Sequence, residues 1–199
     1  MEEVFTNVYE TFQWGNNRNK EYNGSSGAGS AVSYNKDTYI PFLKNFIVEK
    51  GIKEVVDLGC GDFRCGRLIY DDLDVSYTGY DAYKKVIDHN SKEHPDYTFI
   101  HLDFCGHKEQ IRGGDLCILK DVIQHWPLKD IYEFLYYLVE TKKFKYILIC
   151  NCCHQRKDDT DIEAGRMRSL SCDHLPLKKY NPTKLYNYRT KEVSVIQLI

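Results

Sequence analysis

The feature that most constrains this chain is a strand that runs directly into a glycine turn. Residues 55–58 are apolar apart from Asp57, and the sequence Gly-Cys-Gly follows at 59–61 without an intervening loop. Glycine is needed where the backbone takes unusual dihedrals or lets a ligand approach closely. Such a turn at the carboxyl end of a central strand is typical of α/β sheets that bind nucleotides. Asp57 and Asp62 bracket the turn, which suits a ligand with a cationic group better than a pyrophosphate.

From about residue 52 onward, short apolar runs alternate with longer amphipathic ones, as in strands joined by crossover helices. The pattern predicts strands over 54–58, 76–80, 97–102, 115–119 and 146–150, and helices over 36–50 and 128–141. A further helix is expected to begin at Phe63. Two β-rich runs at the end of the chain, divided by polar residues 190–192, indicate a closing antiparallel hairpin.

Composition predicts one soluble globular domain. The chain has 199 residues, 42% of them hydrophobic, and its formal net charge is −2, so a nucleic-acid partner is not favoured. No apolar run approaches the roughly 20 residues of a membrane span. The acidic start MEEVFTNVYE has no secretory signal, so we expect a cytoplasmic protein whose eight cysteines are free thiols.

Two further acids stand where later strands are expected to end. Asp81 closes the second strand and Asp103 the third. A carboxylate at the end of the second strand can accept hydrogen bonds from a ribose diol. Asp103 could receive the exocyclic amine of an adenine. Three acids at the ends of three consecutive strands indicate a nucleoside site more specifically than the glycine turn does alone.

Together with the run KDVIQHW at 120–126, these motifs resemble the class I S-adenosylmethionine (SAM)-dependent methyltransferases. The front of the chain, through Trp14-Gly15, residues 26–30 and Tyr39, resembles a small bacterial and viral group associated with glycan synthesis. The resemblance implies an α/β fold with a Rossmann-like seven-stranded mixed sheet, five parallel strands, a C-terminal antiparallel hairpin and helices on both faces. It also implies a single domain over 1–199, with a cofactor-covering segment (1–35) and a core (36–199).

The resemblance further implies where SAM binds. Gly59 and Gly61 pass under its methionine part, Asp81 holds the ribose, Asp103 lies at the adenine, and residues 26–30 cover the amino-acid end. The full expected set is Trp14, Ser26, Gly27, Ser30, Asp57, Gly59, Cys60, Gly61, Asp81, Ala82, Leu102, Asp103, Phe104 and Lys120. The structural alternatives are a flexible linker over the glycine-rich stretch and a core position for Trp14.

Methyl transfer from a sulfonium is an in-line displacement, so the protein must align the reactants and deprotonate an alcohol. Asp121 and His125 are four residues apart, and on a helix both would project from one face. His125 is then expected to take the hydroxyl proton while Asp121 orients its ring or binds the acceptor. The structural alternative is a helix cap and a surface histidine. A divalent metal at Asp121 and Asn151 is an alternative that is not favoured, because no second acid follows Asn151.

The acceptor is the least constrained part of the prediction. Late aromatic residues at 180, 186 and 188 could stack on a sugar ring, so the leading hypothesis is O-methylation of a sugar or glycan hydroxyl. Base methylation is disfavoured because no Asn/Asp-Pro-Pro-aromatic motif follows the fourth strand. The alternatives are another small-molecule acceptor, an NAD-dependent oxidoreductase, and a non-catalytic SAM-binding partner module. The oligomeric state is unknown from the sequence.

Overall fold

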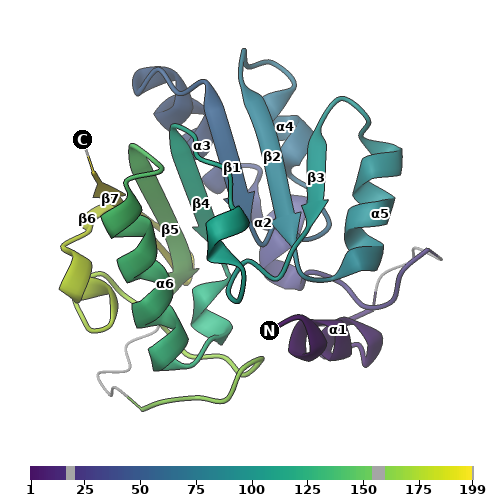
Figure 1. Ribbon diagram of the computed structural model, residues 1–199. Coiled ribbons are helices and arrows are strands. Elements are labelled where there is room, and N and C mark those ends of the chain that lie inside the picture. The colour runs from purple at the N-terminus through teal and green to yellow at the C-terminus, as the bar shows by residue number, and fades with distance from the viewer. Residues whose placement is uncertain (17–20, 154–159, 199) are drawn as a thin grey trace.

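The computed structural model describes residues 1–16, 21–153 and 160–198, arranged around one seven-stranded sheet (Figure 1). The strand order is β3-β2-β1-β4-β5-β7-β6, and β7 runs antiparallel to both of its neighbours while the first five strands are parallel. The strands are β1 Glu54–Leu58, β2 Ser76–Asp81, β3 Thr98–His101, β4 Leu116–Lys120, β5 Tyr146–Cys152, β6 Thr183–Tyr188 and β7 Lys191–Gln197. The predicted Rossmann-like mixed sheet with a closing hairpin is confirmed.

Helices cover both faces of this sheet because successive strand residues point to opposite sides. Val56 and Leu119 face a core that includes Leu135, whereas Val55 and Ile118 face a second core. The helices are α1 Glu2–Glu10, α2 Val32–Asn35, α3 Tyr39–Glu49, α4 Gly66–Tyr70, α5 Lys84–Glu93 and α6 Leu128–Thr141, with single turns η1 Ala28–Ser30, η2 Lys108–Gln110, η3 Ile123–His125 and η4 Leu177–Tyr180. The first core packs against α6 and the second against α3.

The helix expected to begin at Phe63 is the clearest local error. Phe63 has φ 52°, in the left-handed region, and α4 begins only at Gly66. The Phe63 ring packs against that glycine, where an added Cβ would lie 2.0 Å from the ring carbon Cε2. The chain therefore makes an extra turn after the glycine motif before it becomes helical.

Two expectations from composition can be compared with the described residues. No helix among them is long and apolar enough to span a bilayer. All eight cysteines are free thiols, as the sequence predicted.

Candidate functional site

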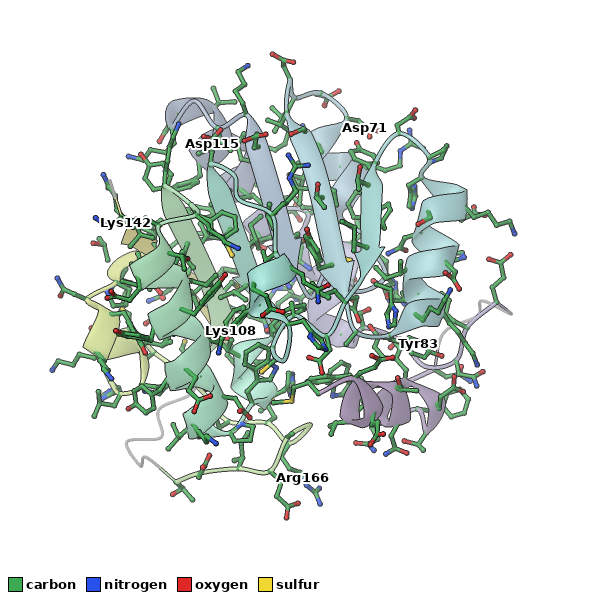
Figure 2. The ribbon with its side chains drawn as sticks, viewed as in Figure 1. Asp71, Tyr83, Lys108, Asp115, Lys142 and Arg166 are labelled. Carbon is green, nitrogen blue, oxygen red and sulfur yellow. The ribbon has the colours of Figure 1, made fainter. Side chains whose placement is uncertain are left out.

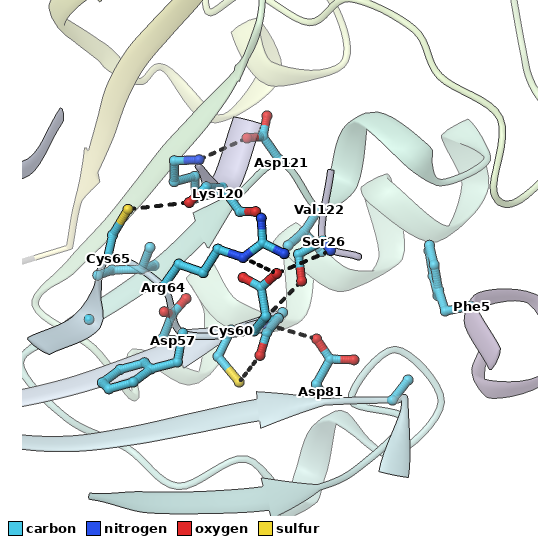
Figure 3. Close-up of a pocket in the computed structure, with 18 of the residues that line it drawn as sticks. Phe5, Ser26, Asp57, Cys60, Arg64, Cys65, Asp81, Lys120, Asp121 and Val122 are labelled. Carbon is cyan, nitrogen blue, oxygen red and sulfur yellow. Dashed lines mark hydrogen bonds and ion pairs between the residues drawn. The ribbon is translucent and has the colours of Figure 1, made fainter. Parts of the chain in front are cut away.

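A pocket opens where β1, β2 and β4 end, between the glycine turn and the N-terminal segment (Figure 3). Its lining includes Trp14, Ser26, Ser30, Asp57, Gly59, Cys60, Gly61, Asp81, Ala82, Asp103, Phe104, Lys120 and Asp121. These residues come from distant parts of the chain, and the sequence predicted each of them for the cofactor or for catalysis. Of the other predicted residues, Gly27, Leu102 and His125 are not part of the lining.

The glycine turn has a backbone that only glycine fits easily. Gly59 and Gly61 have φ 87° and 54°. An added Cβ would lie 2.4 Å from Val122 Cγ2 at Gly59 and 2.5 Å from Ser26 Oγ at Gly61. The backbone N–H groups of Gly59 and Cys60 both donate to the carbonyl of Tyr80. The hydrogen bonds to Tyr80 and the close approach of Val122 and Ser26 thus fix the turn. Because Gly59 and Gly61 have no side chains, a ligand can lie close to the backbone there.

Asp81 is buried at the end of β2 and braces this turn. Its Oδ2 accepts the Gly61 N–H at 3.0 Å and its Oδ1 accepts the Tyr83 N–H at 2.9 Å. Burial raises the pKa of Asp81 to about 6, although the backbone N–H groups lower it. Each carboxylate oxygen can accept more than one hydrogen bond, so the group keeps capacity for ligand hydroxyls.

Asp57 and Asp103, the other two acids at strand ends, have different hydrogen-bond donors from Asp81, and their pKa values are shifted in opposite directions. Asp57 accepts the Tyr77 hydroxyl at 2.9 Å, and burial raises its pKa to about 6. Asp103 Oδ2 accepts the Met1 ammonium at 2.8 Å and the Glu2 N–H at 3.1 Å. Burial would raise the pKa of Asp103, but these donors outweigh it and the pKa is lowered. Asp103 is therefore the acid that the N-terminal residues already contact.

The N-terminal segment supplies pocket residues that the sequence analysis did not identify. Phe5 and Tyr9 of α1 line the pocket. The Tyr9 ring stacks on Tyr83, with ring centroids 4.4 Å apart, and its hydroxyl is 2.7 Å from Ser26 Oγ. Tyr83 lies beside this helix in Figure 2. The amphipathic spacing of Phe5, Val8 and Tyr9 was the available signal for the helix, but not for where it docks.

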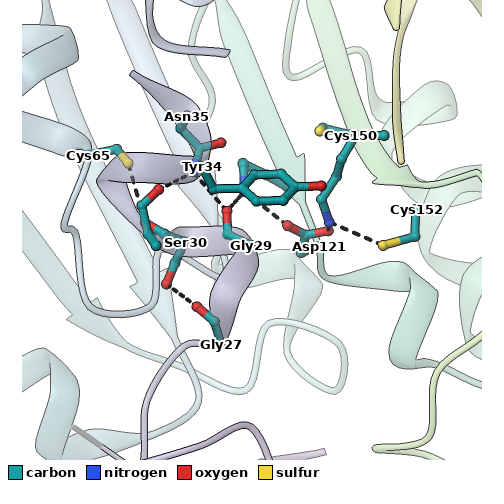
Figure 4. Close-up of polar contacts among 12 residues, drawn as sticks. Gly27, Gly29, Ser30, Tyr34, Asn35, Cys65, Asp121, Cys150 and Cys152 are labelled. Carbon is teal, nitrogen blue, oxygen red and sulfur yellow. Dashed lines mark hydrogen bonds and ion pairs between the residues drawn. The ribbon is translucent and has the colours of Figure 1, made fainter. Parts of the chain in front are cut away.

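The end of β4 carries a buried ion cluster. Asp121 pairs through Oδ2 with Lys120 at 2.9 Å and through Oδ1 with Lys191, a side chain only 4% exposed. Lys120 also donates to the Gly29 carbonyl at 2.8 Å, and Lys191 to Cys152 Sγ at 3.2 Å (Figure 4). Burial would raise the pKa of Asp121, but the two ammonium groups outweigh it and lower the pKa. This cluster ties the loop over residues 28–30 to the sheet.

His125 lies outside the pocket lining and packs against Trp14, which is part of that lining. Their ring centroids are 4.8 Å apart. His125 Nδ1 is 2.9 Å from the Arg166 carbonyl, which can only accept, so Nδ1 carries the proton and Nε2 the lone pair. Nε2 lies 3.2 Å from Gln124 Nε2. Burial lowers the pKa of His125, although the Arg166 carbonyl and Asp121 raise it, so the ring is neutral at pH 7.

The helix that would have placed Asp121 and His125 on one face is not formed. Asp121 has φ 60°, and only the single turn η3 follows it. Asp121 is bonded to its two lysines, and His125 to Arg166 and Gln124. The catalytic pair therefore stays a prediction, without the helical spacing on which it was based.

The predicted metal site and the tyrosines predicted to stack on a sugar can each be compared with the structure. Among the described residues, the groups of three His, Cys, Asp or Glu side chains that could hold an ion are Glu21, His89 and Glu93, and Cys172, Asp173 and Glu192; neither includes Asp121. Tyr186 stacks on Phe42 at 5.2 Å between centroids, and Tyr180 donates to the Tyr132 carbonyl. These tyrosines pack the protein, so they give no support to a sugar-stacking surface, and the sugar acceptor stays a prediction.

Comparison with known proteins decides what this architecture resembles. No protein-family model and no curated protein matches the sequence. Human N-acetylserotonin methyltransferase in complex with SAM matches the structure with a TM-score of 0.59 and 15% identity, over 78% of this chain and 50% of that chain. An O-methyltransferase family protein from Burkholderia thailandensis matches with a TM-score of 0.63 and 10% identity, over 85% and 57%. The methyltransferase domain of bacterial CtHen1 matches with 0.63 and 15%, over 80% and 97%.

The chain has a methyltransferase fold. It spans only about half the length of the first two proteins, whereas it spans nearly all of the CtHen1 domain. At these levels of identity the likeness concerns the fold.

Proposed function

We propose that this chain binds SAM in the pocket and transfers its methyl group to a hydroxyl of a small-molecule acceptor. The observation that carries the proposal is the set of acids Asp57, Asp81 and Asp103, which the ends of β1, β2 and β3 bring to one pocket beside a glycine turn. The structure of human N-acetylserotonin methyltransferase holds SAM, and the Burkholderia protein is described as an O-methyltransferase. Both have this fold, which supports the cofactor and the reaction class.

A sugar or glycan is the acceptor we propose within that class, on the N-terminal resemblance alone. A cytoplasmic location is part of the same proposal, and the eight free thiols support a reducing compartment.

Bound SAM would supply an electrophilic methyl group on a positively charged sulfur. The carboxylates on the pocket wall would hold the nucleoside through its hydroxyls and amine, and the turn at 59–61 would let it lie close to the backbone. We propose that His125 Nε2 takes the proton of the acceptor hydroxyl, because that nitrogen carries a lone pair and the ring is neutral. Gln124 contacts the same nitrogen, so it would have to release this contact when an acceptor binds.

The test combines binding and turnover. SAM should raise the melting temperature of the wild type, and Asp81→Ala should abolish that rise, since a ligand stabilises only the state that binds it. Transfer of labelled methyl to a panel of glycans, nucleotides and phenols, with and without chelator, should identify the acceptor. His125→Ala should lower turnover about 10²- to 10⁴-fold and leave the SAM-induced rise intact.

The alternatives give different results. NAD in place of SAM should produce no rise in melting temperature; a rise with NAD alone would indicate an oxidoreductase. A SAM-induced rise without transfer to any acceptor would indicate a non-catalytic binding module. No rise with millimolar SAM would contradict the proposal.

A further inference from the structure

Asn90 on α5 is a buried amide of which only one half has a partner. The residue is 0% exposed. Its Nδ2 donates to the Gly61 carbonyl at 2.7 Å, whereas its Oδ1 has no hydrogen-bond partner among the described residues. Asparagine is a weak helix former, and a buried oxygen without a donor lowers stability. The one hydrogen bond that Asn90 makes therefore indicates what the residue contributes.

That hydrogen bond holds one side of the peptide unit that joins Gly61 to Asp62. On the other side, the Asp62 N–H donates to Ser26 Oγ at 2.8 Å. Because Gly61 has no Cβ, little in the residue itself prevents this unit from rotating. Rotation would move the carbonyl oxygen away from α5 toward Ser26, which lines the pocket. The oxygen would then stand in the surface on which a ligand has to lie.

Resting on the proposed function, we infer that Asn90 is a positioning residue for cofactor binding. It is not part of the pocket lining and acts through Gly61, whose carbonyl it keeps on the α5 side of the turn. Gly61 is then held through both of its polar backbone groups, because Asp81 accepts its N–H at 3.0 Å. The turn keeps the shape that admits a ligand, at the expense of an unpartnered oxygen in the helix.

The experiment compares ligand affinity with stability in Asn90→Leu. Leucine is similar in size and a better helix former, but it cannot donate to a carbonyl. Without a donor on α5, the Gly61 carbonyl turns toward water in the pocket. Calorimetric titration should therefore show an affinity for S-adenosylhomocysteine that is roughly 3- to 10-fold lower than that of the wild type. The midpoint of urea unfolding should stay close to the wild-type value.

Two further variants keep the test decisive. Asn90→Asp has the same shape, but its carboxylate can only accept, and it repels the Gly61 carbonyl until it takes up a proton. Its affinity relative to the wild type should be lowest above about pH 7 and recover as the pH falls. This recovery carries the test if Asn90→Leu unfolds more easily. Asn45→Leu is the matched control, because Asn45 is exposed in α3, and it should leave the affinity unchanged.

The outcomes separate this inference from the proposed function. An Asn90→Leu variant with wild-type affinity would overturn the role of Asn90 while cofactor binding stands. An affinity of Asn90→Asp, relative to the wild type, that does not change with pH would have the same meaning. A wild type that does not bind S-adenosylhomocysteine would remove the proposed function, and this inference with it.

Discussion

Asp81 and Asp121 occupy comparable places, at the end of β2 and just after β4, but their surroundings are opposite. Asp81 is held by the neutral N–H groups of Gly61 and Tyr83, and burial raises its pKa to about 6. Asp121 is held by the ammonium groups of Lys120 and Lys191, which lower its pKa despite its burial. Within the described part of the chain, Asp81 has no cation at its side, whereas Asp121 has two.

The difference shows that a strand-end position does not by itself decide what an acid does. Asp81 is fixed by its own neighbourhood and keeps lone pairs for a ligand. Asp121 is neutralised by a lysine from β7, which pairs with the end of β5 at Cys152, and it holds the loop at 28–30 through Lys120. We therefore expect ligand binding to depend on Asp81 and folding stability to depend on Asp121.

Of the changes that test this contrast between Asp81 and Asp121, Asp121→Ala should have the largest effect, a loss of folding stability. The substitution leaves Lys120 and Lys191 buried without a counter-ion, and removing one partner of a buried ion pair typically costs about 3–5 kcal/mol. The free energy of unfolding from urea denaturation measures this cost. Asp74→Ala is the control, since its pair with Lys53 is open to solvent and should change stability little. A cost for Asp121→Ala no greater than that of the control would show that the cluster is not a structural anchor.

The next effect is a pH dependence of nucleoside binding that we assign to Asp81, because Asp57, whose pKa is also raised to about 6, is engaged by the Tyr77 hydroxyl. Its pKa is raised from 3.8 to about 6, so the carboxylate is protonated below that pH and cannot accept from both ribose hydroxyls. The affinity for 5′-methylthioadenosine should fall as pH decreases below about 6, by up to about tenfold per pH unit, and level off above 7. This ligand is chosen because it carries the adenosine part of SAM without the charged amino-acid end. Calorimetry from pH 5 to 7.5 measures the slope, which Asp81→Asn should flatten; a wild type without any slope would contradict the assignment of Asp81 to the ribose.

The parts of the fold predicted well from sequence depend on short-range patterns. The structure has β1 over Glu54–Leu58 and α6 over Leu128–Thr141, with the predicted bounds. A hydrophobic period of two or of three to four residues is a local property, and it survives folding because the core selects that same face. The three acids and the glycine turn come together because the carboxyl ends of parallel strands lie at one edge of the sheet.

The parts predicted poorly depend on contacts between distant residues. Nothing near Asp121 in the sequence indicates that Lys191, on the last strand, neutralises it. Phe63 delays a helix because its ring lies against Gly66 in a left-handed turn. Tyr9 enters the pocket because α1 docks against Tyr83, and an amphipathic pattern predicts a helix without predicting its partner.

The third expected effect, on stability and smaller than that of Asp121→Ala, tests how rigid the Asp121 cluster is. A Cβ added at Gly29 would lie 2.9 Å from Asp121 Oδ2 and 3.3 Å from Lys191 Nζ, so Gly29→Ala should destabilise the protein by about 1–3 kcal/mol through overpacking. Gly106→Ala is the matched control, because its added Cβ would meet only ordinary contacts, the nearest at 3.6 Å. In the Asp121→Ala background the cost of Gly29→Ala should largely disappear, because the two sites are in contact. If the two costs instead add in urea denaturation, the cost of Gly29→Ala does not come from its contact with Asp121. That result would contradict a rigid Asp121 cluster and the contrast drawn with Asp81.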